Sequence, residues 1–208
     1  MKQIDSVQGN TVKAHKVEPI KRLLEKATGL GVPTREEALA NVRDVKPLRM
    51  KFRDDGYIPN NPKLPLLYYR KVIHFSRKHD PAATLEVIFN DHSWGKAWRN
   101  GIYDFVHYHP MIHEVLGIAR GSAVLRLGGN RGKTVKVAAG DIILVPAGVG
   151  HECLKPSRHF LVVGAYPPHG TYSECRGSFQ ERAKAISSIR RVSVPKQHPI
   201  FGTDRPVW

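Results

Sequence analysis

The chain has 208 residues, which suits one ordinary domain and would be cramped for two. Hydrophobic residues make up 41% of it, enough to bury a core, so disorder throughout is excluded. The formal net charge of +15 is spread as +4 over residues 1–60, +5 over 61–154 and +6 over 155–208. Because no arm or single helix concentrates this charge, a solvated basic surface is favoured over a nucleic-acid site. Attraction of anionic substrates is compatible with both interpretations.

Targeting signals and cysteines narrow the class of protein further. The longest apolar runs, such as 142–145 and 160–166, are far shorter than the roughly 20 residues that span a bilayer. The first 16 residues lack the apolar core of a secretory signal, so we expect a cytoplasmic protein. Two cysteines, Cys153 and Cys175, are too few for a disulfide framework or a Cys-rich zinc module. Any metal must therefore be held by His and carboxylate side chains.

The N-terminal region predicts two short helical pieces within residues 17–42. The second piece begins with a capping box, in which the Thr34 hydroxyl accepts from a free amide and Glu37 reaches back. Pro47 then interrupts the pattern. We interpret this region as an extension docked on the main domain or on a partner subunit. A helix-turn-helix DNA reader is less favoured, since it needs a third packing helix and a basic recognition face.

The remainder of the chain predicts short strands. Residues 54–66 are loop by composition, residues 68–75 form a strand, and a helix begins at Asp80 and ends near Asn90. A weak helix covers residues 179–189. Short runs without intervening helices favour an antiparallel barrel or sandwich. The runs that follow Gly101 are 102–109, 114–119, 123–127, 135–137, 142–146 and 160–166.

These elements predict a simple domain organisation. Residues 1–47 form a helical N-terminal extension, and residues 48–208 form a single domain whose core barrel covers about 68–167.

The segment 101–121 holds the first group of candidate metal ligands. His107 and His109 lie two residues apart on a predicted strand, so both imidazoles leave the same face and can reach one ion. Pro110 ends that strand. Glu114 opens the next strand and offers a hard oxygen ligand beside the two rings.

The segment 140–151 adds a fourth candidate ligand. A strand and a turn at Pro146 and Gly148 place His151 at the start of another strand. If these strands are neighbours, three imidazoles and one carboxylate converge. Such a set suits a divalent transition metal (Fe, Mn, Ni, Co, Cu or Zn) and leaves one or two coordination positions open.

The two segments resemble the paired motifs of the cupin superfamily. The first motif, G(x)5HxH(x)3-4E(x)6G, is matched by residues 101–121 at every spacing. The second, G(x)5PxG(x)2H(x)3N, is matched from residue 140 to His151, and Lys155 replaces its final Asn. The runs WGKAWRNGIYDF, HEVLGIARG and VVGAYPP are similar to those of the YjlB-like single-domain cupins. The resemblance covers roughly residues 52–208.

This resemblance implies a fold and a metal site but no single reaction. The implied fold is all-β: a cupin (jelly-roll type) β-barrel, often a dimer, with the N-terminal helical extension and a few peripheral helices. His107, His109, Glu114 and His151 would hold the metal inside the wider mouth. Cupins include dioxygenases, sugar-phosphate isomerases, decarboxylases and proteins that only bind.

Three further residues near the motifs are weaker candidates for a functional role. His113 has the opposite strand parity to Glu114, so it points away from the metal unless a bulge shifts the register. Cys153 shares the parity of His151 and can line the pocket, although a buried small apolar side chain is the favoured interpretation. Cys175 lies in a polar tail and predicts no chemistry.

Tyr103 and Arg99 are the candidate catalytic residues. Tyr103 shares the inward face of the histidines, so its hydroxyl can meet a bound ligand, whereas Phe105 on the same face is expected in the core. Arg99 can clamp a substrate carboxylate through two hydrogen bonds. A structural pairing of Arg99 with Asp104 or another acid is equally expected.

These observations predict a mononuclear metal-binding cupin that acts on a small, anionic organic molecule. Dioxygenase chemistry is the first hypothesis, because three histidines and a carboxylate suit redox-active iron, and an isomerase is also open. The alternative is a non-catalytic metabolite-binding or sensor cupin with a structural metal. We expect a homodimer and neither a membrane nor a nucleic-acid partner.

Overall fold

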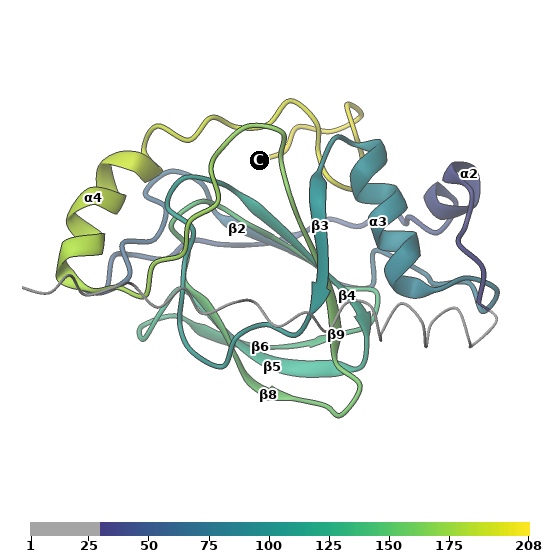
Figure 1. The fold of residues 1–208 in the computed structure, drawn as a ribbon, viewed down its shortest axis with the longest axis horizontal. Coiled ribbons are helices and arrows are strands. Elements are labelled where there is room, and N and C mark those ends of the chain that lie inside the picture. The colour runs from purple at the N-terminus through teal and green to yellow at the C-terminus, as the bar shows by residue number, and fades with distance from the viewer. Residues whose placement is uncertain (1–29) are drawn as a thin grey trace, which may run out of the picture.

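The computed structural model describes residues 30–208, which form two antiparallel sheets and three helices (Figure 1). The larger sheet has the strand order β1-β2-β7-β4-β9-β3, and the smaller has the order β6-β5-β8. The predicted all-β, jelly-roll-type fold with peripheral helices is confirmed, with its strands divided between two sheets. The strands are β1 Leu48–Met50, β2 Leu66–Tyr69, β3 Gly95–Asn100, β4 Glu114–Arg120, β5 Ser122–Leu127, β6 Lys133–Ala138, β7 Ile142–Val145, β8 His151–Pro156 and β9 Leu161–Tyr166.

Strand β4 lies in the middle of the larger sheet and separates two halves of the core. Val115 and Ala119 pack into the cluster on the helical side of the sheet. Leu116 and Ile118 pack into the second cluster, which includes the inner faces of β5 and β8. Because side chains alternate along a strand, Glu114 faces the same way as Leu116, toward the smaller sheet. Its carboxylate is thereby directed into the space between the sheets.

Helix α3 (Pro81–Asp91) covers the outer face of β4, with the start and end that the sequence predicts. Gly117 lets the helix approach closely: a Cβ there would lie 2.9 Å from Leu85 and 3.0 Å from Phe89. The close contact holds β4, and the residues at its start, against the helix.

The described part of the predicted N-terminal extension docks on the main domain. The capping box of Thr34 and Glu37 is present and begins α2 (Arg35–Leu39). This helix packs against α3, and Ala38 is fully buried in the core. The first of the two predicted helical pieces lies largely outside the described residues.

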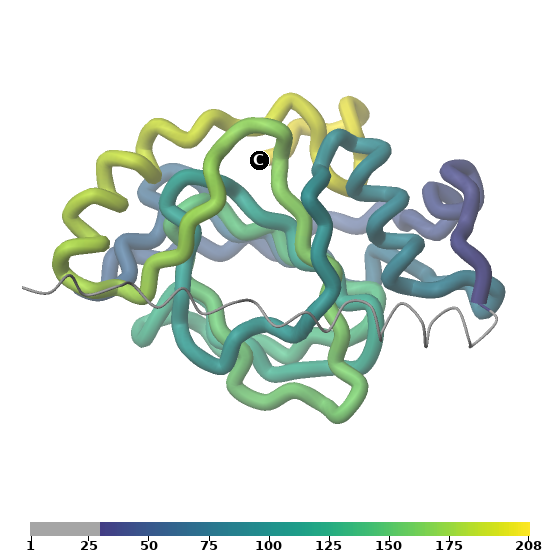
Figure 2. Tube along the Cα trace, in the orientation of Figure 1, coloured from purple at the N-terminus to yellow at the C-terminus, as the bar shows by residue number. Residues whose placement is uncertain are grey.

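Helix α4 (Phe179–Ile189) confirms the weak helix predicted near the C-terminus, and Ser178 caps it. Figure 2 shows the chain after α4, in yellow, running back across the top of the larger sheet. Trp208 at its end donates its indole N–H to the carbonyl of Pro65 at 2.8 Å. Within residues 30–208, every helix falls short of the length and hydrophobicity that a membrane crossing requires.

Two predicted strands differ from the structure. The strand predicted over 68–75 ends at Tyr69, because Lys71 adopts a φ of 51° and its N–H binds the Asp141 carboxylate at 2.8 Å. The strand predicted over 102–109 is an extended loop. Only isolated bridges occur there, because His107 pairs with His151 whereas the next residue, Tyr108, pairs with Cys175. Strands β1 and β3 were not predicted.

A buried carboxylate joins α3 to strands β3 and β4. Asp80 is 4% exposed and caps the helix by accepting from the amides of Ala82 and Ala83 at 3.3 and 3.1 Å. It also accepts from Arg99 Nη1 at 2.9 Å and from Arg120 Nη2 at 2.7 Å. One anion therefore satisfies two helix amides and two guanidinium groups.

Replacing Asp80 by Asn keeps an N-cap acceptor but removes the negative charge that faces the two guanidinium groups. Because a buried ion pair that loses one partner leaves the other charge poorly compensated, we expect the free energy of unfolding to fall by about 3 kcal/mol. Chemical denaturation measures this loss. The exposed Glu36→Gln is the matched control and should change stability by less than about 0.5 kcal/mol. Equal stability of the two variants would contradict the structural role of Asp80.

Candidate metal centre

Backbone hydrogen bonds bring the two motif segments together. His107 N donates to His151 O at 3.2 Å, and His151 N donates to His107 O at 2.9 Å. Gly148 N, in the turn before β8, donates to His109 O at 2.8 Å. The loop between β3 and β4 is thus tied to the start of β8, and residues more than forty positions apart in sequence become neighbours.

In His107, His109 and His151, the ring nitrogen Nδ1 forms a hydrogen bond with a backbone carbonyl. Because a carbonyl only accepts, Nδ1 must carry the hydrogen, and in the neutral ring Nε2 is left with its lone pair. This tautomer is the one that a metal ligand needs, since it directs Nε2 into the site. The three contacts are His107 Nδ1 to Phe105 O at 3.3 Å, His109 Nδ1 to Ser173 O at 2.8 Å, and His151 Nδ1 to Val149 O at 3.2 Å.

The three rings converge at the end of the space between the sheets. One ligand atom from each of His107, His109 and His151 lies within 4.8 Å of the other two. The rings of His107 and His151 are 4.2 Å apart between centroids, and all three side chains are buried. The described residues therefore contain a cluster of three histidines that can hold a divalent metal ion.

The carboxylate of Glu114 faces this cluster. Its Oε2 lies 3.5 Å from Nε2 of His109 and 3.3 Å from Nε2 of His151. The side chain is 2% exposed, and Oε2 has no hydrogen-bond partner among the described residues. Buried carboxylate oxygens are rarely left without a partner. An orphaned anionic oxygen within 3.5 Å of two imidazole nitrogens, beside a third ring of the same cluster, is the environment that a cation would satisfy, so the residues fit a metal.

Burial and mutual charge set the protonation of the cluster. Burial, with the neighbouring His151 and His109, lowers the pKa of His107 to about 2, so this ring is neutral. Burial opposes protonation of His109, but the Glu114 carboxylate outweighs it and raises the pKa. Burial alone would raise the pKa of Glu114, and the attraction of His109 and His151 lowers it well below its usual range. A proton and a metal ion thus compete for the same space.

A cavity of about 430 Å³ opens onto the cluster. Its volume falls within the range of about 300–1,000 Å³ typical of small-molecule sites. Aromatic side chains form much of its wall, namely Trp98, Tyr103, Tyr166 and Tyr172.

The structure places Tyr103 beside the cluster, as predicted, with its ring centroid 5.1 Å from that of His107. Phe105 was predicted to lie in the core. In the structure it is half-buried and belongs to none of the core clusters. It stacks on Tyr103 at 4.7 Å, and the Arg176 guanidinium lies 3.9 Å above its ring. The difference arises because this segment is a loop, in which strand parity does not decide burial.

The guanidinium of Arg99 is held by two acids. Its Nε and Nη2 donate to the Glu86 carboxylate at 2.7 and 2.6 Å, and Nη1 donates to Asp80 at 2.9 Å. Of the two roles expected for Arg99, the structure therefore shows the structural pairing. Arg99 also lines the cavity.

His113 lies outside the cluster, as its strand parity predicts. It is fully buried, accepts from Ala147 N at 2.9 Å, and packs on Trp208 with 4.6 Å between ring centroids. Cys153 is buried in the core between the sheets, which confirms the favoured interpretation. Cys175 is half-buried and pairs its backbone with Tyr108.

Sequence reasoning did not single out Tyr166, Tyr172 or Ser173. Tyr166 ends β9 and shares the inner face with Val162, so strand alternation could have found it. Tyr172 lies over His109, with 4.9 Å between ring centroids, and Ser173 supplies the carbonyl that binds His109. Both belong to an irregular loop with no periodic signal.

Two antiparallel sheets enclose three histidines, and the paired motifs supply all three. These features define a cupin with a candidate metal centre. No family model matches the chain. It is 36% identical over 156 residues to the uncharacterized protein YjlB of Bacillus subtilis (strain 168), across 75% of this chain and 91% of that protein. The chain belongs to the YjlB-like family of single-domain cupins.

Two solved structures are similar to part of this chain. An acireductone dioxygenase from Bacillus anthracis has a TM-score of 0.35 at 16% identity, over 50% of this chain and 80% of that chain. The WlaRB TDP-quinovose 3,4-ketoisomerase from Campylobacter jejuni has a TM-score of 0.34 at 11% identity, over 44% and 74%. At these scores the likeness says nothing about the reaction of this chain.

The coupling of Glu114 and His109 predicts a pH window of stability in the metal-free protein. The lowered pKa of Glu114 stabilises the fold above its ordinary value of 4.5, and the raised pKa of His109 stabilises it below its ordinary value of 6.5. The first contribution is lost as the pH falls through the folded pKa of Glu114. The second is lost as the pH rises through the folded pKa of His109.

Replacing Glu114 by Gln should therefore lower the free energy of unfolding most between pH 4.5 and 6.5. We expect a loss of about 3 kcal/mol there, because the variant removes one partner of the buried ion pair between Glu114 and the protonated His109. Chemical denaturation of both proteins in a chelator, at about pH 5.5 and about pH 8.5, measures the difference. A loss of the same size at both pH values would contradict the coupling.

Proposed function

We propose that this protein is a mononuclear metal-dependent enzyme that acts on a small, anionic organic molecule, with Glu114 joining His107, His109 and His151 as the fourth ligand. The observation that supports it most is that Nδ1 of all three rings binds a backbone carbonyl, while Nε2 of His109 and of His151 lies near Glu114 Oε2. Rings that serve only packing have no need of a common tautomer.

The charge of the site favours an anionic ligand. Three neutral imidazoles and one carboxylate around a divalent ion leave a net charge of +1 in a buried position. An uncompensated charge is costly where water is excluded, and one anionic group on the ligand would neutralise it. The surplus of basic residues over the whole chain acts in the same direction, by attracting anions to the surface.

Tyrosine hydroxyls supply the hydrogen bonds that orient such a ligand. Burial raises the pKa of Tyr103 and of Tyr166, so both hydroxyls are protonated near neutral pH and can donate to an anionic oxygen. Trp98 Nε1 donates to the Tyr166 oxygen at 3.0 Å. That bond occupies the Tyr166 oxygen and leaves its hydrogen directed toward Glu114 or a ligand in the cavity.

When bound, a redox-active ion such as iron would supply dioxygen chemistry, which makes a dioxygenase the first reaction to test. The chain itself binds and orients the organic acid through Tyr103 and Tyr166. The aromatic wall of the cavity excludes water from the reacting atoms.

Removing two of the four proposed ligands should abolish metal retention. We expect His107→Ala combined with His151→Ala to retain less than about a tenth of the metal that the wild type holds, because only two ligands remain. Elemental analysis of protein purified without a His tag measures retention, and circular dichroism checks the fold. The matched control is His74→Ala combined with His159→Ala, which removes two exposed histidines. Retention near the wild-type level in the first variant would contradict the ligand assignment.

Oxygen uptake tests the proposed reaction. The iron-loaded protein should consume dioxygen in the presence of at least one member of a panel of organic acids, and the His107→Ala/His151→Ala variant should not. An oxygen electrode with product analysis by mass spectrometry measures this. Binding of organic acids without turnover under any metal would contradict the enzyme and support a sensor instead.

A further inference from the structure

We propose that the ligand of this site is an organic acid with a single anionic group and an apolar, aromatic-sized body. The inference rests on the proposed function, because the anionic group is taken to bind the metal. It narrows the substrate class by asking what the remainder of the cavity can bind.

The described lining of the cavity offers a second anion no cationic side chain beyond the paired Arg99. Arg99 is the one Lys or Arg among the described lining residues, and its guanidinium already binds Glu86 and Asp80. Arg176 lies over the Phe105 ring and pairs with Glu174 at 3.3 Å. A phosphate or a second carboxylate on the ligand would be desolvated without a cation to receive it. Phosphorylated compounds and dicarboxylates are therefore disfavoured.

The cavity offers aromatic surface instead. Tyr103 and Tyr172 are 42% and 50% exposed, although each ring contacts a histidine of the cluster. The Tyr103 ring lies 5.1 Å from His107, and the Tyr172 ring lies 4.9 Å from His109. Exposed aromatic rings grouped around a site mark a surface that binds an apolar partner. A ligand held by the metal would cover these two rings with its body.

The inner wall is apolar and rigid as well. Trp98 packs so closely on the facing β9 that a Cβ at Gly164 would lie 2.1 Å from its indole ring. The indole is held there by its hydrogen bond to Tyr166. Ile102 and Leu116 add aliphatic surface to the same cavity. A preformed apolar wall favours a ligand body of matching chemistry and shape, because little ordering is needed on binding.

Three carboxylates that differ by one feature test the inference on zinc-loaded protein by calorimetry. We expect benzoate to bind about tenfold more tightly than acetate, which lacks the ring. Terephthalate, which adds a second carboxylate to the same ring, should bind about tenfold more weakly than benzoate. Equal affinity for benzoate and acetate, or for benzoate and terephthalate, would overturn the inference and leave the proposed metal site standing.

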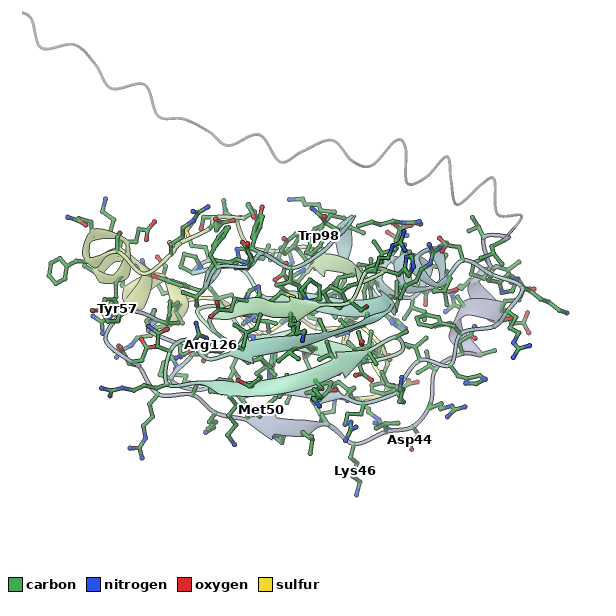
Figure 3. The ribbon with its side chains drawn as sticks, turned by 90° about the horizontal axis from the view of Figure 1, so that it is seen from below. Asp44, Lys46, Met50, Tyr57, Trp98 and Arg126 are labelled. Atoms are coloured by element: carbon green, nitrogen blue, oxygen red, sulfur yellow. The ribbon has the colours of Figure 1, made fainter. Side chains whose placement is uncertain are left out.

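Substitution of the exposed rings locates the effect. Tyr172→Ala should weaken benzoate binding about fivefold and leave acetate binding and zinc content unchanged, whereas Tyr172→Phe keeps the ring and the affinity. Tyr57→Ala is the matched control, because Tyr57 is also exposed (64%, against 50% for Tyr172) and lies near α4, well apart from Trp98 (Figure 3). A failure to load zinc, or to bind any of the three carboxylates, would overturn the proposed function together with the inference.

Discussion

The constraint on which the site depends is the hydrogen bonding of three Nδ1 atoms to backbone carbonyls. Side chains alone could rotate about their bonds, but each ring here is fixed by a carbonyl of the chain that surrounds it. Two of those carbonyls, from Phe105 and Val149, lie only two residues from the ring that they hold. The third comes from Ser173, sixty-four residues beyond His109. Local backbone shape and long-range packing thus both decide where the Nε2 atoms point.

The two-sheet fold supplies the space in which those atoms meet. Glu114 opens β4 of the larger sheet, and His151 opens β8 of the smaller sheet, so one end of the core holds ligands from both. Helix α3 fixes β4 from outside through the close approach at Gly117, and Asp80 joins that helix to Arg99 and Arg120. The ion network around Asp80 therefore helps to keep the position of Glu114, and it also binds the guanidinium of Arg99, a residue that lines the cavity.

Much of this could be predicted from the sequence, because short-range rules decided it. The capping box of Thr34 and Glu37, the strands around Gly121 and Gly140, and the spacing of His107 and His109 are local patterns that the structure keeps. The partners of Arg99 could not be predicted, since Asp80 and Glu86 reach it only through the packing of α3 on β3. Tyr172 and Ser173 were not predicted either, because an irregular loop has no periodic pattern from which the direction of a side chain can be inferred.

Nuclear magnetic resonance of the histidine nitrogens tests the central claim most directly. In zinc-loaded protein labelled with ¹⁵N, long-range correlations between ring protons and nitrogens identify which nitrogen of each ring binds the ion. The account predicts that His107, His109 and His151 all bind through Nε2 and all keep a hydrogen on Nδ1. Coordination through Nδ1 in any of the three, or a ring unchanged by zinc, would contradict it.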